Sequence, residues 1–159
     1  MKFARIGNPG KEKPIIVDKD NNYRDVSSVI KDFNSDNLNF ETLEKFKNIK
    51  PEDLPILEKN QRIGACVNNP SKFIGIGLNF KDHAIEQNMP IPKEPIIFSK
   101  FTNSVSGPND DIVIPKNSNH TDWEVELGFV IGKKCSYVSE KDAIDYVLGF
   151  FLVNDVSER

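Results

Sequence analysis

Two apolar stretches interrupted by acidic residues constrain this chain more than any other feature. The stretch DWEVELGFVIG contains Glu124 and Glu126, and the stretch GFFLVNDV contains Asp155. Because side chains alternate faces along a strand, Glu124 and Glu126 lie on one face and their apolar neighbours on the other. Two carboxylates beside a core tend to protonate unless a cation offsets their charge. The pattern predicts strands that hold a hard divalent metal, Mg²⁺ or Mn²⁺, since carboxylate oxygens suit these ions better than zinc.

The acidic residues also have simpler interpretations. A Glu-x-Glu pair is typical of the solvated face of an edge strand. The residues after Gly128 are apolar on both faces, which disfavours that interpretation here. Asp155 equally suits a turn or an N-cap before Ser157. A metal site that only stabilises the fold, without activating water, remains a further possibility.

Composition and charge narrow the class of protein. The chain has 159 residues, of which 38% are hydrophobic and 28% charged, enough for a folded core. A net charge of -3 disfavours a nucleic-acid or anionic-membrane partner. No apolar run approaches the ~18 residues of a membrane span, and two cysteines are too few for a disulfide framework. We expect a cytoplasmic protein with no nucleic-acid and no membrane partner.

The order of predicted elements divides the chain into two modules. Residues 1–65 form a small N-terminal module, with a strand at MKFARI, a hairpin at PIIVDKDNNYRDVS and a helix at FETLEKFKNI. Residues 66–159 form a module dominated by strands, at FIGIGL, IIFSK, IVIP, WEVELGFVI and FFLVNDV, with short helices at FKDHAIEQ and SEKDAIDYVLG. The fold class is α+β, mainly β.

A second chemical feature is a histidine with a nearby glutamate. His83 and Glu86 are three residues apart on the predicted helix FKDHAIEQ, so the carboxylate can orient the imidazole and the pair can activate a water. An ordinary surface helix collects the same pair without function. A dinucleotide-binding interpretation of Gly75 and Gly77 is disfavoured, because Phe80 stands where a third glycine belongs.

Three segments, in this order, resemble the fumarylacetoacetate hydrolase family: GIGLNFKDHAIEQNMPIPKEPIIFSK, DWEVELGFVIGK and DAIDYVLGFFLVNDVSER. The resemblance covers about residues 70–159 and is greatest to the short, divalent-metal-dependent members in the ureidoglycolate lyase and diketo-deoxy-sugar-acid hydrolase branch. It implies a mixed β-roll catalytic domain behind a small N-terminal α+β module, usually in a homodimer. Such proteins usually continue well beyond a position like Arg159, so we expect a C-terminally truncated chain with an incomplete roll, poorly stable or inactive alone.

The resemblance also implies roles for individual residues. The metal, Mg²⁺ or Mn²⁺, would be held by Glu124, Glu126 and Asp155, with water completing the coordination. The catalytic dyad would be His83 and Glu86, which match a His-x-x-Glu pair on a small helix of the family.

Two basic residues complete the predicted site. Lys100 matches a lysine that ends a strand in the family and would neutralise the substrate carboxylate or an oxyanion. Arg159 would bind the substrate as a bidentate carboxylate clamp.

The activity that the resemblance implies is Mg²⁺-dependent hydrolysis of a carbon-carbon bond in a small 2,4-diketo acid, an acylpyruvate or diketo-deoxy-sugar acid, through a metal-bound enolate. Alternatives on the same metal platform are a ureidoglycolate lyase, an oxaloacetate decarboxylase, a hydratase or an isomerase. An alternative of another class is a non-catalytic truncated relative in which the roll serves subunit association.

Overall fold

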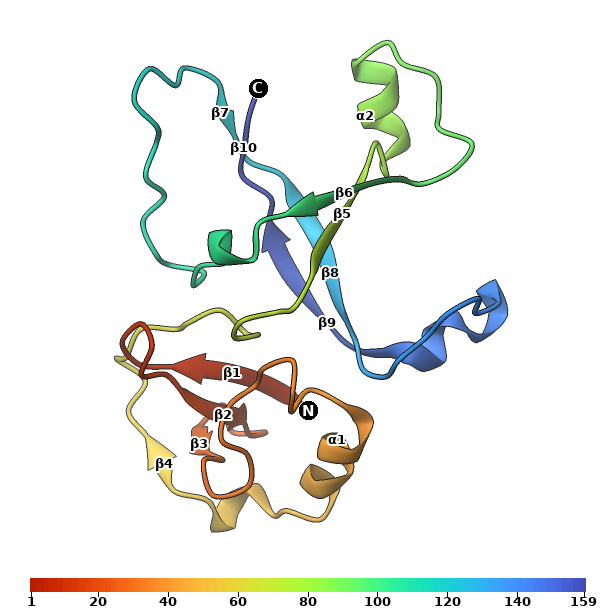
Figure 1. Cartoon of the computed structure of the whole chain (residues 1–159). Helices are drawn as coiled ribbons and strands as arrows, with labels where there is room; N and C mark the ends of the chain where they lie inside the picture. Colours follow the sequence, from red (N-terminus) through yellow and green to blue (C-terminus); the bar gives the residue numbers. More distant parts are fainter. The chain divides into compact units, whose positions relative to one another are not determined.

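The computed structural model describes all residues, 1–159, and they group into two compact units. One unit contains residues 1–68 together with residues 106–159, and the other contains residues 69–105. Figure 1 shows the elements of both. The fold is a mixed α+β structure in which strands predominate, as expected. The division into modules at residues 65 and 66 stays a prediction.

The first unit begins with a four-stranded antiparallel sheet in the order β1-β2-β3-β4, and one helix lies between β3 and β4 along the chain (Figure 1). The strands and helix are β1 (Lys2–Ile6), β2 (Lys13–Val17), β3 (Tyr23–Asp25), β4 (Ile56–Leu57) and α1 (Phe40–Lys47). Asn39 caps α1, because its side-chain oxygen accepts a 2.9 Å hydrogen bond from the Thr42 amide. The predicted strand, hairpin and helix of the N-terminal module are confirmed.

The N-terminal part of this unit has its own hydrophobic core. The buried residues of this cluster come from β2, from the segment after β3 and from α1: Ile16, Val26, Ile30, Phe33 and Phe46. The ring of Phe3 meets those of Phe33 and Phe46 edge to face, with centroids 5.3 and 5.2 Å away. This packing explains why the four short strands and one helix form a stable layer.

A buried arginine joins the sheet to the segments around it. Arg5 is only 3% exposed. Its Nε and Nη2 donate to the two carboxylate oxygens of Asp32 at 2.6 and 3.0 Å, and Nη2 also donates to Glu12 at 3.3 Å. Its Nη1 donates to the Ala65 carbonyl oxygen at 3.1 Å. The guanidinium is therefore compensated by two carboxylates and a backbone oxygen, as a buried charge requires.

A second arginine extends this network to a distant turn. Arg62 Nη1 donates to Glu12 at 2.9 Å, and Arg62 Nε donates to Asp110 at 2.6 Å. Asp110 also accepts a 2.6 Å hydrogen bond from the Gly107 amide. A Cβ at Gly107 would lie 2.3 Å from the Ile63 carbonyl oxygen, so only glycine fits this turn. The network fixes the turn before the candidate site to the N-terminal sheet.

The rest of the first unit is built on a long antiparallel ribbon of two strands, β8 (Val125–Ile131) and β9 (Val147–Asn154) (Figure 1). Before and after it, β7 (Thr121–Asp122) pairs with β10 (Ser157–Glu158). The prediction of an α-helix at SEKDAIDYVLG is wrong in the type of helix and in the position of its end. A 3₁₀ helix covers Glu140–Tyr146, and β9 begins at the next residue, Val147. Strand pairing with β8 overrides the local helical pattern of this segment.

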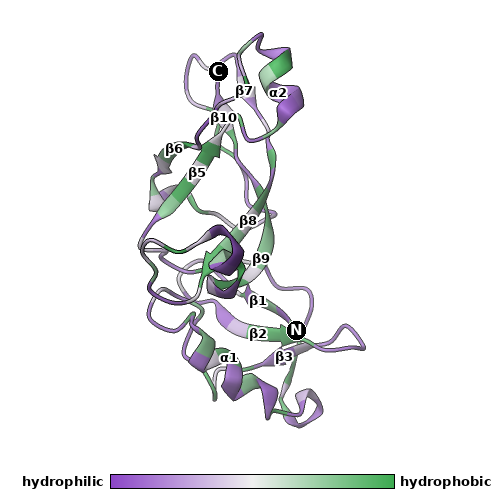
Figure 2. Ribbon diagram, turned by 90° about the vertical axis from the view of Figure 1, so that its right-hand side faces the viewer, coloured by the Kyte–Doolittle hydropathy of each residue, from purple (hydrophilic) through white to green (hydrophobic).

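One further strand prediction is wrong, and one face of the ribbon is exposed. The IVIP segment forms no strand; its Pro115 has no amide hydrogen to donate to a ladder. The apolar side chains on one face of the β8–β9 ribbon are exposed, including Leu127 at 64% and Leu152 at 81%, and so is Trp123 just before β8. A ribbon of two strands in one layer has only one covered face. Here the covered face is the one that carries Glu124 and Glu126. Figure 2 shows hydrophobic residues along β8 and β9.

The second unit contains a two-stranded antiparallel sheet and a short helix (Figure 1). Its elements are β5 (Phe73–Gly77), α2 (Lys81–Glu86), β6 (Ile96–Lys100) and a 3₁₀ turn, Thr102–Ser104. The predicted strands FIGIGL and IIFSK and the helix FKDHAIEQ are confirmed in place, but β5 is not buried, because Ile74 and Ile76 are exposed. No helix of the protein is both long and apolar enough to traverse a bilayer.

Candidate metal centre and catalytic dyad

The strand register brings the three predicted metal ligands onto one face of the β8–β9 ribbon. Glu126 lies opposite Val153 in the ladder. Beyond the last ladder pair, the Asp155 amide donates a 2.8 Å hydrogen bond to the Glu124 carbonyl oxygen, which sets these two residues opposite one another. Opposite residues share a face, and so do residues two apart in one strand. Three acidic residues from two distant segments are thus neighbours in the backbone.

The face with the acidic residues is the more buried face of the ribbon. Glu124, Glu126 and Asp155 are each partly buried, whereas the residues that alternate with them in β8 are exposed. Phe151 contributes to this cover, since a Cβ added to Gly128 would lie 2.6 Å from its ring. The carboxylates therefore lie on a partly apolar surface, where a cation lowers the free energy of the charged state.

The side chains themselves do not enclose an ion. No group of three or more histidine, cysteine, aspartate or glutamate side chains in the 159 residues has the geometry of a metal site. The oxygen-only donor set of Glu124, Glu126 and Asp155 suits Mg²⁺ or Mn²⁺ by its chemistry, and the backbone places the three residues on one face. The assignment of these residues as metal ligands stays a prediction, because the carboxylates are not gathered around a common point.

Arg159 is a cation that contacts this face. Its Nη2 donates to Oε1 of Glu124, and its Nε donates to Oδ2 of Asp122 at 3.1 Å. The residue is held by backbone pairing, since its amide donates to the His120 carbonyl oxygen at 3.1 Å. The hydrogen bonds with Glu124 and then Asp122 raise the pKa of Arg159 above its ordinary value. The predicted role as a substrate clamp stays a prediction, and the contacts that the structure shows are with protein carboxylates.

Glu158 has a structural role that the sequence did not reveal. Its carboxylate accepts hydrogen bonds from Ser118, from Thr121 Oγ1 at 2.7 Å and from the His120 amide at 3.2 Å. The hydrogen bond from Ser118, followed by that from Thr121, holds the pKa of Glu158 below its ordinary value. These contacts tie β10 to the segment before β7 and so position Arg159.

The predicted dyad is present on α2, in the unit of residues 69–105. Nδ1 of His83 lies 3.6 Å from Oε2 of Glu86, an ion-pair distance that is too long for a hydrogen bond. The imidazole is 34% exposed and the carboxylate 75% exposed, while Ala84 between them is buried. The helix thus anchors itself through Ala84 and leaves the dyad accessible. Its catalytic role stays a prediction.

Lys100 is the last residue of β6, in the same unit as the dyad. It lies opposite Phe73 in the β5–β6 ladder, which fixes its place at the strand end. Its role as a neutralising cation stays a prediction.

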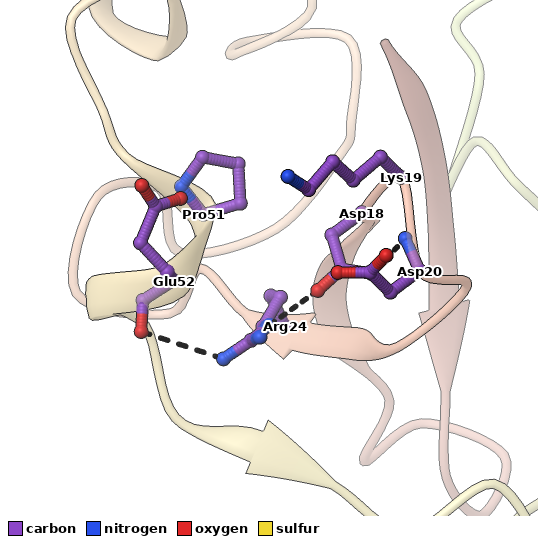
Figure 3. Close-up of a pocket in the computed structure, with 6 residues that line it drawn as sticks. All are labelled: Asp18, Lys19, Asp20, Arg24, Pro51 and Glu52. Atoms are coloured by element: carbon purple, nitrogen blue, oxygen red, sulfur yellow. Dashed lines mark hydrogen bonds and ion pairs between the residues drawn. The ribbon is translucent and has the colours of Figure 1, made fainter.

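Two hollows of the surface lie in the first unit. One, of about 420 Å³, is lined by Asp18, Arg24 and Glu52, among others (Figure 3). Arg24 Nε donates to Asp18 at 2.8 Å and Nη1 to the Leu54 carbonyl oxygen at 3.1 Å, so these charges hold the hairpin turn. The other, of about 210 Å³, is lined by Ile112, Trp123 and Val156, among others. Trp123 and Val156 are the sequence neighbours of Glu124 and Asp155.

Comparison with known proteins decides the family. Residues 72–159, more than half of the chain, match the family model described as fumarylacetoacetate (FAA) hydrolase C-terminal. The chain belongs to the fumarylacetoacetate hydrolase family. The match contains all of the predicted site residues, from His83 to Arg159.

Similar proteins agree with this membership. The chain is 54% identical, over all of its 159 residues, to a Burkholderia multivorans protein named "Putative hydrolase". It spans 56% of that protein, so it covers about half the length of the curated relatives it matches. The name of this relative places it only at the level of a hydrolase.

Two solved structures share the fold. The first is described as a "putative HpcE protein" from Mycobacterium smegmatis, with 29% identity and a TM-score of 0.79 over 98% of this chain and 55% of that chain. The second is maleylpyruvate hydrolase from Sphingobium sp. SYK-6, in complex with manganese(II) and pyruvate. It has 22% identity and a TM-score of 0.77 over 100% of this chain and 60% of that one. The expected fold of the family is thereby confirmed.

Proposed function

We propose that the protein carrying these 159 residues is a metal-dependent hydrolase that cleaves a carbon-carbon bond in a small 2,4-diketo acid. The observation that carries this proposal is the register of β8 and β9, which sets Glu124 opposite Asp155 with Glu126 on the same face. The manganese and pyruvate named for the structurally similar maleylpyruvate hydrolase support the same class of metal and product.

In this proposal the acidic face holds the metal. Glu124, Glu126 and Asp155 would supply carboxylate oxygens to Mg²⁺ or Mn²⁺. When bound, such an ion stabilises the negative charge that develops on the substrate oxygens during bond cleavage. An ion with this role also explains why three acidic residues occupy the more buried face of the ribbon.

The dyad would supply the nucleophile. Glu86, whose Oε2 lies 3.6 Å from Nδ1 of His83, would orient the imidazole and leave the other ring nitrogen to accept a proton from water. The resulting hydroxide adds to the distal carbonyl carbon, the neighbouring carbon-carbon bond breaks, and its electron pair leaves with the pyruvate-like fragment, which then accepts a proton. Lys100 would neutralise a carboxylate of the substrate. The reaction consumes one water and yields two acids.

The test is turnover of a panel of acids by purified protein with Mg²⁺ or Mn²⁺. The panel contains acylpyruvates, diketo-deoxy-sugar acids, oxaloacetate and ureidoglycolate, so that hydrolysis is distinguished from decarboxylation and lyase activity. We expect hydrolysis of at least one diketo acid, abolished by a chelator. We also expect Glu126→Gln to lower kcat/KM at least a hundredfold and His83→Ala to lower kcat by about 10² to 10⁴.

Two matched variants control for the chemical changes. Glu140→Gln removes an exposed carboxylate from the 3₁₀ helix, and His120→Ala removes the imidazole of a histidine that does not belong to α2. Both should retain full activity. Unchanged turnover in Glu126→Gln or His83→Ala would show that the assigned roles are wrong, and turnover without any metal would refute the proposed class of enzyme.

Homodimerisation is part of the same proposal. Its support is membership of the family and the exposed apolar face of the β8–β9 ribbon. Sedimentation velocity at several protein concentrations tests it, and a monomer at all of them would contradict it.

A further inference from the structure

The contacts of Arg159 raise a question about the candidate metal centre. An arginine at a site for a divalent cation is unexpected, because the two positive charges repel one another at close range. Here the guanidinium contacts Glu124, one of the three predicted ligands, and Asp122, which immediately precedes the acidic stretch. The same carboxylate therefore serves an internal cation in this structure and an external cation in the proposed function.

The position of Arg159 is built by the surrounding chain. The β10–β7 pairing sets Ser157 opposite Asp122 and Glu158 opposite Thr121, and the Arg159 amide continues this pairing to His120. The carboxylate of Glu158 adds three hydrogen bonds to the same segment. Arg159 therefore approaches Glu124 from a fixed backbone, and its side chain needs only rotamer changes to leave.

We infer that Arg159 is a counter-ion that occupies the Glu124 carboxylate when no metal is bound and is displaced when the ion enters. This inference rests on the proposed function, and it adds a regulation of the same site. Displacement requires Glu124 to exchange a guanidinium for a metal ion, while Asp122 remains available to hold the released arginine. The released guanidinium keeps its full charge and its planar fork, which matches a carboxylate in bidentate geometry. Arg159 is thus a positioning residue for the metal and becomes available to a substrate acid only in the loaded site.

The competition between Arg159 and the metal ion predicts the direction in which the metal affinity changes when Arg159 is replaced. Because the arginine and the ion compete for one carboxylate, removing the guanidinium must strengthen metal binding in the absence of substrate. Arg159 is 40% exposed, so its two ion pairs are partly screened by solvent. We expect Arg159→Gln to bind Mn²⁺ roughly two- to tenfold more tightly than the unaltered chain, and Arg159→Lys to fall between them.

The experiment titrates the protein that carries these 159 residues with Mn²⁺ and follows the free ion by electron paramagnetic resonance. Lys134→Gln is the charge-matched control, because Lys134 is exposed near the opposite end of the ribbon from Glu124. Its affinity for Mn²⁺ should equal that of the unaltered chain. Equal affinity in Arg159→Gln and Lys134→Gln would overturn the inference, and so would weaker binding by Arg159→Gln.

A second measurement avoids any substitution that disturbs folding. The Nε–H resonance of Arg159 is followed by nuclear magnetic resonance while Mg²⁺ is added to the unaltered chain. A shift that saturates with the same Kd as metal binding supports displacement, and an unchanged resonance at saturation overturns it. If neither the unaltered chain nor Arg159→Gln binds either ion, the proposed function and the inference fall together. If both bind with equal affinity, only the inference falls.

Discussion

Removal of Asp32 tests the buried ionic network of the N-terminal sheet. Asp32 is the main partner of Arg5, with hydrogen bonds of 2.6 and 3.0 Å to the guanidinium. It also accepts from the Asn68 side chain at 2.7 Å and from the Phe33 amide at 2.8 Å. Asp32→Ala therefore removes four contacts at once and leaves a guanidinium that is 3% exposed beside only one carboxylate.

The size of the effect follows from these contacts. Breaking a buried ion pair by removing one partner costs about 3–5 kcal/mol, because the remaining charge is uncompensated. Glu12 still lies 3.3 Å from Arg5, which places the expected loss near the lower end, at about 3 kcal/mol. Asp32→Asn keeps the shape and part of the hydrogen bonding, so about 2 kcal/mol is expected. The double variant Arg5→Met with Asp32→Leu should lose less than Asp32→Ala, since no buried charge is left without a partner.

The assay is native-state hydrogen exchange of the β1 and β2 amides, which reports the opening free energy of this sheet. Asp36→Ala is the matched control, because Asp36 lies exposed in the same segment. Its exchange should match that of the unaltered chain. A loss below about 1 kcal/mol in Asp32→Ala, or a double variant less stable than Asp32→Ala, would refute the view that charge compensation controls this core.

Two further predictions concern acid and packing. Burial alone would raise the pKa of Asp18, but hydrogen bonds from the Asn22 amide and the Arg24 guanidinium outweigh it and lower the pKa to about 2. Because the folded pKa lies below the ordinary value of 3.8, the stabilisation is complete above that value and is lost as the pH falls toward 2. The melting temperature should fall over this range less steeply in Asp18→Asn; equal slopes would contradict the assignment. Gly128→Val would set a Cβ 2.6 Å from the Phe151 ring and should destabilise the ribbon by about 1–3 kcal/mol, seen as faster amide exchange in β9, and unchanged exchange would contradict the close approach.

Local patterns were sufficient for the N-terminal module. Alternating and continuous apolar runs located β1 and β2, and the helical spacing of Phe40, Leu43 and Phe46 located α1. In each case the local preference and the tertiary packing agree. They conflict at SEKDAIDYVLG, where the helical pattern continues into β9 and pairing with β8 determines the structure.

The candidate site was only partly visible in the sequence. Glu124 and Glu126 stand two apart in an apolar run, so their shared face follows from strand geometry alone. The position of Asp155 opposite Glu124 depends on the ladder between β8 and β9. The contact between Arg159 and Glu124 could not be read from spacing, because it depends on the pairing of β10 with β7.

By itself the sequence selected the residues that are predicted to carry the chemistry: a trio of acidic side chains, the His83–Glu86 pair and the basic residues Lys100 and Arg159. Residue type and periodicity are local properties that suffice to single out the acidic trio and the His83–Glu86 pair, whereas Lys100 and Arg159 were added through the resemblance to the family. Only the tertiary structure decided that β8 and β9 set the acidic residues on one face, that this face is the more buried one, and that Arg159 contacts it. Register and burial depend on contacts between segments far apart in the chain, and no local pattern contains them.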